Sequence, residues 1–154
     1  MADAPITTEL TAEEIAAEQQ DISEQKAVRL AKRERLIAAA ADLGGGAYPV
    51  SVPVTTTIPA LRARFGELEA GAETGEIAGI AGRVMYLRNT GKLCFATLQS
   101  GDGSRIQAMI SLAAVGEESL AEWKELVDLG DHLFVSGEVI SSRNRFLDAE
   151  ARRA

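Results

Sequence analysis

The sequence contains very few of the residues that carry catalysis and metal binding in most enzymes. It has one cysteine, Cys94, and one histidine, His132, among 154 residues. A single cysteine excludes an internal disulfide and a cysteine-ligated metal cluster. His132 opens an apolar run without a serine or cysteine arrangement beside it, so we expect a structural role for it. We recognise no catalytic constellation, and we expect these residues alone to be inactive.

Long hydrophobic runs are also missing. No stretch approaches the roughly 20 apolar residues that cross a membrane. The opening residues, MADAPITTELTAEE, lack the basic start and apolar middle of a secretory signal. The composition, 46% hydrophobic and 25% charged residues, is ordinary for a globular protein. These features predict a cytoplasmic protein that has no membrane partner.

Positive charge is absent from the start of the chain. Residues 1–25 hold seven acidic side chains and no lysine or arginine. The net charge of −7 therefore lies in this segment, and residues 26–154 balance 16 acidic against 16 basic side chains. We expect residues 1–20 to be a disordered acidic leader. Any contact with nucleic acid must rest on local basic patches.

A basic helix is predicted to follow the leader. Asp21 and Glu24 fit a capping box at its start, and Gly44-Gly45-Gly46 ends it. One side of this helix carries five cations: Lys26, Arg29, Lys32, Arg33 and Arg35. Either they form a solvated surface paired with nearby glutamates, or Lys26, Arg29 and Arg33 contact phosphates. An extended segment and a short helix over 59–65, with Thr57 as its cap, should come next.

Three apolar runs between residues 76 and 110 predict an antiparallel meander. Two turn signals, Asn89-Thr90-Gly91 and Ser100-Gly101-Asp102-Gly103, separate the runs. A helix over 115–129 and a strand over 132–140 should follow. This order is that of the oligonucleotide/oligosaccharide-binding (OB) barrel, except for its last strand. We therefore predict a mainly β fold with helices (α+β), an OB barrel preceded by a helix, and leave open whether the last strand is present.

The predicted parts of the chain are four. They are the leader (1–20), the N-terminal helix with an extended linker (21–75), the OB barrel (76–143) and an atypical C-terminal tail (144–154).

The second and third strands alternate between a core side and an outer side. Cys94, Ala96 and Leu98 should point inward, as should Ile106, Ala108 and Ile110. The opposite side carries the aromatic ring of Phe95, the amide of Gln107 and the cation of Arg105. An exposed ring beside an amide and a cation is suited to stacking a base and hydrogen-bonding its edge. Asn89 and Lys92, in the turn before this strand, are further candidate contacts.

Three stretches resemble the N-terminal part of class II lysine–tRNA ligases, in their actinobacterial form. They are LAKRERLIAAAADLGGGAYPVSVPVTTTI, GIAGRVMYLRNTGKLCFATLQSGDGSRIQAMISL and WKELVDLGDHLFVSGEVISSR. The resemblance implies a barrel that binds a uridine-rich tRNA anticodon. In that family an aromatic residue stacks on an anticodon base and an amide reads a uridine, which implies these roles for Phe95 and Gln107. It also implies a role for Arg88, whereas Leu87 replaces a second basic residue that is frequent in the family.

The resemblance further implies the partners and the limits of this chain. The expected partner is a tRNA with a lysine-type anticodon, and the alternative is a protein-interaction role with a homodimer partner and no independent RNA binding. No cofactor is expected here, because ATP and magnesium would belong to a catalytic domain that these 154 residues do not include. Residues 144–154 depart from the family's fifth strand. Phe146 and Leu147 are adjacent, so a strand would bury only one of them, and we expect a helix or a loose tail.

Overall fold

The computed structural model describes residues 24–41, 48–141 and 147–151. The chain forms two compact units, one ending at Val50 and the other beginning at Ser51. The first unit contains the described helix α2 (Glu24–Ala41), which confirms the predicted basic helix. The expected leader, the capping residue Asp21 and the glycines after the helix lie outside the described residues. No described helix is both long enough and apolar enough to cross a membrane.

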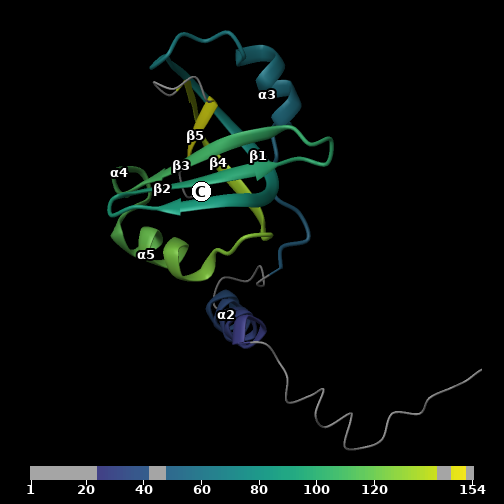
Figure 1. The fold of residues 1–154 in the computed structure, drawn as a ribbon, viewed down its shortest axis with the longest axis vertical. Coiled ribbons are helices and arrows are strands. Elements are labelled where there is room, and N and C mark those ends of the chain that lie inside the picture. Colours follow the sequence, from purple (N-terminus) through teal and green to yellow (C-terminus); the bar gives the residue numbers. More distant parts are fainter. Residues whose placement is uncertain (1–23, 42–47, 142–146, 152–154) are drawn as a thin grey trace, which may run out of the picture. The chain divides into compact units, whose positions relative to one another are not determined.

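The second unit is a closed five-stranded barrel (Figure 1). Its strands are β1 (Glu73–Asn89), β2 (Leu93–Gln99), β3 (Arg105–Ser111), β4 (His132–Ser141) and β5 (Leu147–Ala151). Around the barrel the order is β1-β2-β3-β5-β4. Every neighbouring pair is antiparallel except β3 with β5, which is parallel. This is the topology of the OB fold, and it confirms the predicted fold class.

The fifth strand corrects the expectation for the C-terminal end. A helix or loose tail was the wrong prediction for residues 147–151, because they form β5. On one side β5 pairs with Gln107–Met109 of β3, and on the other with Gly137–Ser141 of β4. The prediction weighed only large side chains. Two open strand edges also offer unpaired backbone groups, and a short segment that pairs with both satisfies them whatever its side chains.

The predicted alternation of β2 and β3 is confirmed. The inward residues of the two strands are at most 1% exposed: Cys94, Ala96, Leu98, Ile106, Ala108 and Ile110. β1 and β4 complete this core with Ala78, Ile80, Val84, Val135 and Val139. Such close-packed alternation leaves every second residue of β2 and β3 on the outer side of the barrel.

Two helices close the core from different sides of the strands (Figure 1). α3 (Ile58–Phe65) is capped by Thr57, as predicted, and buries Ile58 and Leu61 to 1–2% exposure. α3 therefore belongs to the barrel unit and not to a linker. The helix predicted over 115–129 is shorter in the structure, where α5 spans Glu117–Leu126. A separate short helix that was not predicted, α4 (Leu112–Val115), precedes it and ends at Gly116, whose φ of 84° favours glycine. Trp123 of α5 packs against the core.

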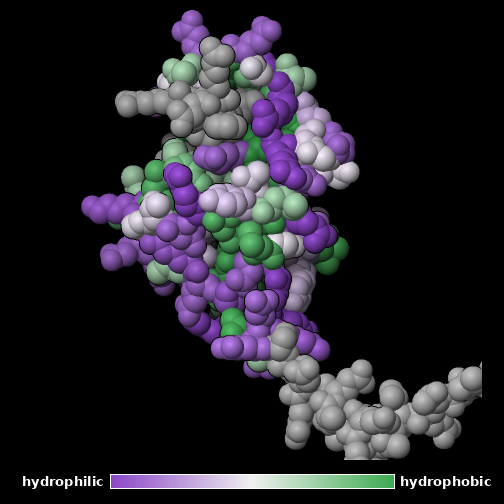
Figure 2. Space-filling model, viewed as in Figure 1, coloured by the Kyte–Doolittle hydropathy of each residue, from purple (hydrophilic) through white to green (hydrophobic). Residues whose placement is uncertain are grey.

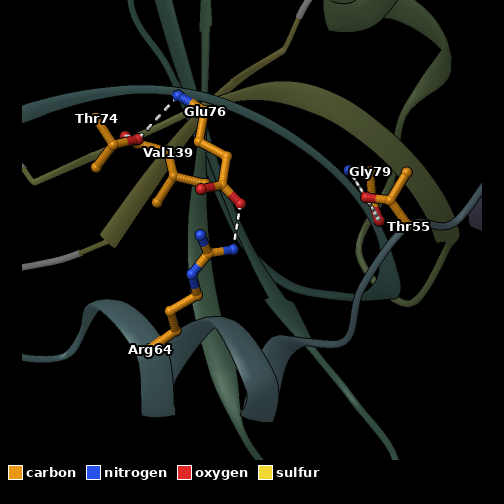
Figure 3. Close-up of polar contacts among 6 residues, drawn as sticks. All are labelled: Thr55, Arg64, Thr74, Glu76, Gly79 and Val139. Carbon is orange, nitrogen blue, oxygen red and sulfur yellow. Dashed lines mark hydrogen bonds and ion pairs between the residues drawn. The ribbon is translucent and has the colours of Figure 1, made fainter.

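A short extended segment binds the first half of β1 (Figure 3). β1 has 17 residues; its first half pairs with β4 and its second half with β2. The backbone N–H of Thr55 donates to the carbonyl of Gly79 at 2.9 Å, and the N–H of Gly79 donates to Thr55 Oγ1 at 2.8 Å. Arg64 of α3 forms an ion pair with Glu76 nearby. We call residues 53–56 the strap, because they bind the backbone N–H and carbonyl of Gly79 in β1.

Candidate nucleic-acid interface

Three cross-strand rows cover the outer face of β1, β2 and β3. Residues directly opposite one another on neighbouring strands place their side chains on the same face of a sheet. Each row has one residue from β1, one from β2 and one from β3, in that order. The rows are Arg88–Phe95–Met109, Tyr86–Thr97–Gln107 and Arg83–Gln99–Arg105. We call these outer side chains the β1–β3 face. Figure 2 shows patches of hydrophobic surface breaking a largely hydrophilic exterior on the barrel.

The first row holds an aromatic ring under a cation. The guanidinium carbon of Arg88 lies 4.8 Å from the centroid of the Phe95 ring, which is cation–π distance. Phe95 is half-buried and lies outside the set of hydrophobic side chains that form or pack against the core. Its ring is thus held by its neighbours on the face instead of by the barrel interior. A flat ligand can stack on such a ring when the guanidinium moves aside.

The second row holds the amide. Gln107 is half-buried, directly opposite Thr97, and one row from Phe95. Diagonal neighbours of this kind have Cα atoms about 7–8 Å apart, within reach of long side chains. An amide offers two donors and a carbonyl acceptor, which suits the edge of a base. The structure therefore brings Phe95 and Gln107 together on one face, as the alternation of the sequence predicted, and it places Arg88 beside them. The roles of these residues stay predictions.

The third row is occupied by contacts within the protein. The Nε of Arg105 donates to Gln99 Oε1 at 2.7 Å, and the Nε of Arg62 donates to the Arg105 carbonyl at 2.6 Å. The cation that meets the ring is therefore Arg88 and not Arg105. Asn89 and Lys92 are exposed beside the β1–β2 turn, at the same end of β2 as Phe95. The contacts proposed for Asn89, Lys92 and Arg105 remain predictions.

The remaining sequence candidates lie on α2, in the other unit. Lys26, Arg29 and Arg33 are all exposed on this helix. Arg33 Nε donates to the Tyr48 hydroxyl at 3.1 Å, and its guanidinium carbon lies 5.9 Å from the centroid of the Tyr48 ring. This helix belongs to the first unit, whereas the β1–β3 face belongs to the second.

The β2–β3 turn is held by one carboxylate. Asp102 accepts hydrogen bonds from the Ser100 hydroxyl, from the Ser104 hydroxyl at 2.7 Å and from the Ser104 N–H at 3.0 Å. The bonds from Ser100 and then Ser104 lower the pKa of Asp102. As predicted, Asp102 serves the turn. Within the described part of the chain, no group of three or more His, Cys, Asp or Glu residues is placed to hold a metal ion.

A bulge in β1 brings two residues to the face that simple alternation would turn inward. The register of β1 against β2 shifts between Val84 and Tyr86, so that Met85 is an extra residue. Val84 points into the core; counting in twos from it would send Tyr86 and Arg88 inward as well. The bulge reverses their direction, a common use of bulges near functional sites. Sequence reasoning missed Tyr86 for this reason, because no residue type in this stretch marks a bulge.

Comparisons with known proteins agree with the fold of the barrel. Residues 79–150 match the family described as an OB-fold nucleic acid binding domain. A lysine–tRNA ligase of Kineococcus radiotolerans is 57% identical over 124 residues, which are 80% of this chain and 24% of that protein. A lysine–tRNA ligase of Mycolicibacterium gilvum is 57% identical over 123 residues, again 80% of this chain and 24% of the relative.

A more distant match is a lysylphosphatidylglycerol biosynthesis bifunctional protein LysX of Nocardia farcinica. It is 36% identical over 121 residues, which are 79% of this chain and 10% of that protein. The chain thus spans 24% of the length of the lysine–tRNA ligases that it matches at 57% identity. Topology, family match and identity agree: the chain carries the anticodon-type OB-fold domain of the lysine–tRNA ligase family.

Proposed function

We propose that the β1–β3 face binds the anticodon of a tRNA with a lysine-type sequence, by stacking a base on Phe95 and hydrogen-bonding a base edge to Gln107. The observation that carries this proposal is the Phe95 ring on the outer face of β2, with Arg88 at 4.8 Å from its centroid. Strands 2 and 3 are the usual binding surface of OB folds. The names of the relatives, lysine–tRNA ligases, supply the type of tRNA.

Stacking of a base on Phe95 would use a ring that is not part of the hydrophobic core. A base stacked on an aromatic side chain contributes about 1–3 kcal/mol and is tolerant of sequence. The guanidinium of Arg88 already lies over this ring in the free protein. On binding, it would either sandwich the base or turn to a phosphate, since arginine suits both. Binding would thus use two side chains that already lie together, and the guanidinium would move to admit the base.

Gln107 would supply the choice of base. The edge of uridine presents an N–H between two carbonyls, and an amide complements one carbonyl and the N–H together. Cytidine replaces one of these carbonyls with an amine, so an amide of fixed orientation would leave polar groups unpaired. An unpaired buried group costs about 1–3 kcal/mol. In this proposal the chain recognises RNA; the homodimer and the cytoplasmic location stay predictions.

Gln107→Ala should lower discrimination between uridine and cytidine more than it lowers affinity. Loss of one base-edge contact should reduce the preference for uridine about tenfold, given about 1–3 kcal/mol for such a pair. The measurement is titration of stem-loops that differ by one uridine-to-cytidine change. Gln99→Ala is the matched control, because Gln99 is an amide of the same sheet that accepts from Arg105 at 2.7 Å. Equal discrimination by Gln107→Ala and wild type would contradict the role of Gln107.

Arg88→Ala should weaken binding of all stem-loops alike and flatten the dependence of affinity on salt. A phosphate contact contributes about one released counterion, so the slope of log K against log salt should fall by about 1. Arg83→Ala is the control: Arg83 is another exposed arginine of β1, and its Nη1 donates to the Gly130 carbonyl at 3.3 Å. If Arg88→Ala weakens binding without changing the salt slope, Arg88 supports the Phe95 ring and does not contact a phosphate.

A further inference from the structure

We infer that Tyr86 forms a second stacking position on the β1–β3 face, for the base next to the one on Phe95. This inference rests on the proposed function. Tyr86 is 59% exposed, in the row beside Phe95, directly opposite Thr97. Sequence reasoning and the family resemblance had assigned it no role.

The position of Tyr86 is built into the backbone. At the bulge, Val84 is held on the side away from β2 by the loop before β4: its N–H donates to the Asp131 carbonyl and its carbonyl accepts from the Gly130 N–H, both at 2.8 Å. On the other side Tyr86 is opposite Thr97 of β2. The backbone is thus anchored on both sides of the bulge. A ring placed outward by an anchored bulge has a defined position, which a stacking platform requires.

The surroundings of Tyr86 also favour a flat, partly apolar ligand. Two exposed apolar side chains lie near the bulge in the chain or in the loop that binds it. Met85, the extra residue of the bulge, is 40% exposed, and Leu129, next to Gly130 in the loop, is 57% exposed. A large aromatic side chain left in water on a sheet gains nothing from burial. Tyr86 lies in the row next to that of Phe95 and Arg88, so a nucleic acid strand that occupies that row would reach it.

The spacing of the two rings fits consecutive bases that are splayed apart. Rows on one face of a sheet are two residues apart along a strand, or about 7 Å. Nucleotides stacked on one another rise only about 3.4 Å along a strand. Two bases on these rings would therefore not stack on each other, and each would lie on its own ring. Single-stranded loops are commonly recognised in this splayed form.

A cycle of protein variants and abasic RNA tests this inference. The anticodon stem-loop is titrated in its intact form and with an abasic residue at each anticodon position in turn. Tyr86→Ala should weaken binding of the intact stem-loop about five- to tenfold, a typical loss for one stacked base. When the base that stacks on Tyr86 is the abasic one, Tyr86→Ala and wild type should bind the RNA equally well. Phe95→Ala should likewise lose its effect at one abasic position, and the two positions should be adjacent in the anticodon. Tyr86→Phe, which keeps the ring, should bind like wild type.

Two controls separate stacking from folding. Tyr86→Thr lacks the ring but suits a strand, so it should reproduce the loss even if Tyr86→Ala folds poorly. Ile77→Thr removes an apolar side chain that is 53% exposed in the half of β1 that pairs with β4, and should leave the affinity unchanged.

Each remaining outcome gives a definite answer. If Phe95→Ala weakens binding and Tyr86→Thr does not, the second position is wrong and the proposed function stands. If the loss from Tyr86→Thr is the same for every abasic RNA, Tyr86 does not stack on a base and the inference is likewise overturned. If neither Phe95→Ala nor Tyr86→Thr changes affinity, the proposed function itself fails.

Discussion

Phe95→Ala is expected to weaken binding of a uridine-rich anticodon stem-loop about tenfold or more, while leaving the stability of the barrel nearly unchanged. Loss of one stacking platform costs about 1–3 kcal/mol. The ring contributes little to the fold, because Phe95 lies on the outer face and outside the hydrophobic core. Its contact with Arg88 is worth about 0.5–1 kcal/mol at an exposed site. Titration with the stem-loop, beside denaturant unfolding of both proteins, measures the two effects.

The barrel unit contains a matched control for this experiment. Phe65 of α3 also lies under an arginine, with the guanidinium carbon of Arg64 at 4.8 Å from its ring centroid. Unlike Phe95, Phe65 packs against the core. Phe65→Ala should therefore lower the free energy of unfolding and leave the affinity of the folded fraction unchanged. If Phe95→Ala behaves like Phe65→Ala, with stability lost and affinity kept, the ring is structural and the anticodon proposal for this face is wrong.

The inner and outer sides of β2 and β3 could be predicted because their sequence alternates without interruption. Each inward residue from Cys94 to Leu98 and from Ile106 to Ile110 is buried, and each residue between them faces outward. Period-two patterning is a local property, and two tight turns fix the register. Phe95 and Gln107 could therefore be assigned to one face from the sequence alone.

The bulge and the fifth strand depend on distant partners. Next to the extra residue at Met85, Val84 donates its N–H to the Asp131 carbonyl and accepts from the Gly130 N–H, more than forty positions further on. For that reason alternation could not place Tyr86, and Arg88 was assigned only through the family resemblance. β5 likewise forms because β3 and β4 leave two edges to pair. Both features follow from closing the barrel, which no window of neighbouring residues encodes.

α3 shows the same limit on a smaller scale. Ile58 and Leu61 are three residues apart and both buried, which is a helical spacing. This short helix contains only two such residues. Two residues are too few for the sequence to show whether the helix packs on the core or belongs to a linker. Their burial depends on the open end of the barrel that they fill.

Gly79→Ala should destabilise the barrel by about 2–4 kcal/mol, the largest effect on stability that we expect. A Cβ on Gly79 would lie 2.8 Å from the Pro53 carbonyl oxygen and 3.1 Å from the Phe134 ring. Such overpacking costs about 1–3 kcal/mol. If the strap instead moves away to relieve the overpacking, the N–H of Gly79 loses Thr55 Oγ1 and its carbonyl loses the Thr55 N–H, and each unsatisfied buried group costs about 1–3 kcal/mol. The shift in denaturant midpoint measures the net effect.

Two further variants divide this effect into its parts. Thr55→Val keeps the shape of the strap but removes the hydroxyl that accepts from Gly79, and should cost about 1–2 kcal/mol. Gly101→Ala, in the β2–β3 turn, introduces a Cβ that meets nothing within 4 Å and should be nearly neutral. Wild-type stability of Gly79→Ala would show that the strap is not bound to β1.

The same variants test whether stability and recognition are separate along β1. The strap contacts β1 at Gly79, in the half that pairs with β4, whereas Tyr86 and Arg88 lie in the half that pairs with β2. The bulge after Val84 lies between these two contacts, and it is held by Gly130 and Asp131 instead of by the strap. We therefore expect Gly79→Ala to unfold more readily and to bind the stem-loop with unchanged affinity while folded. An affinity that falls together with stability would mean that the strap also sets the position of the binding half of β1.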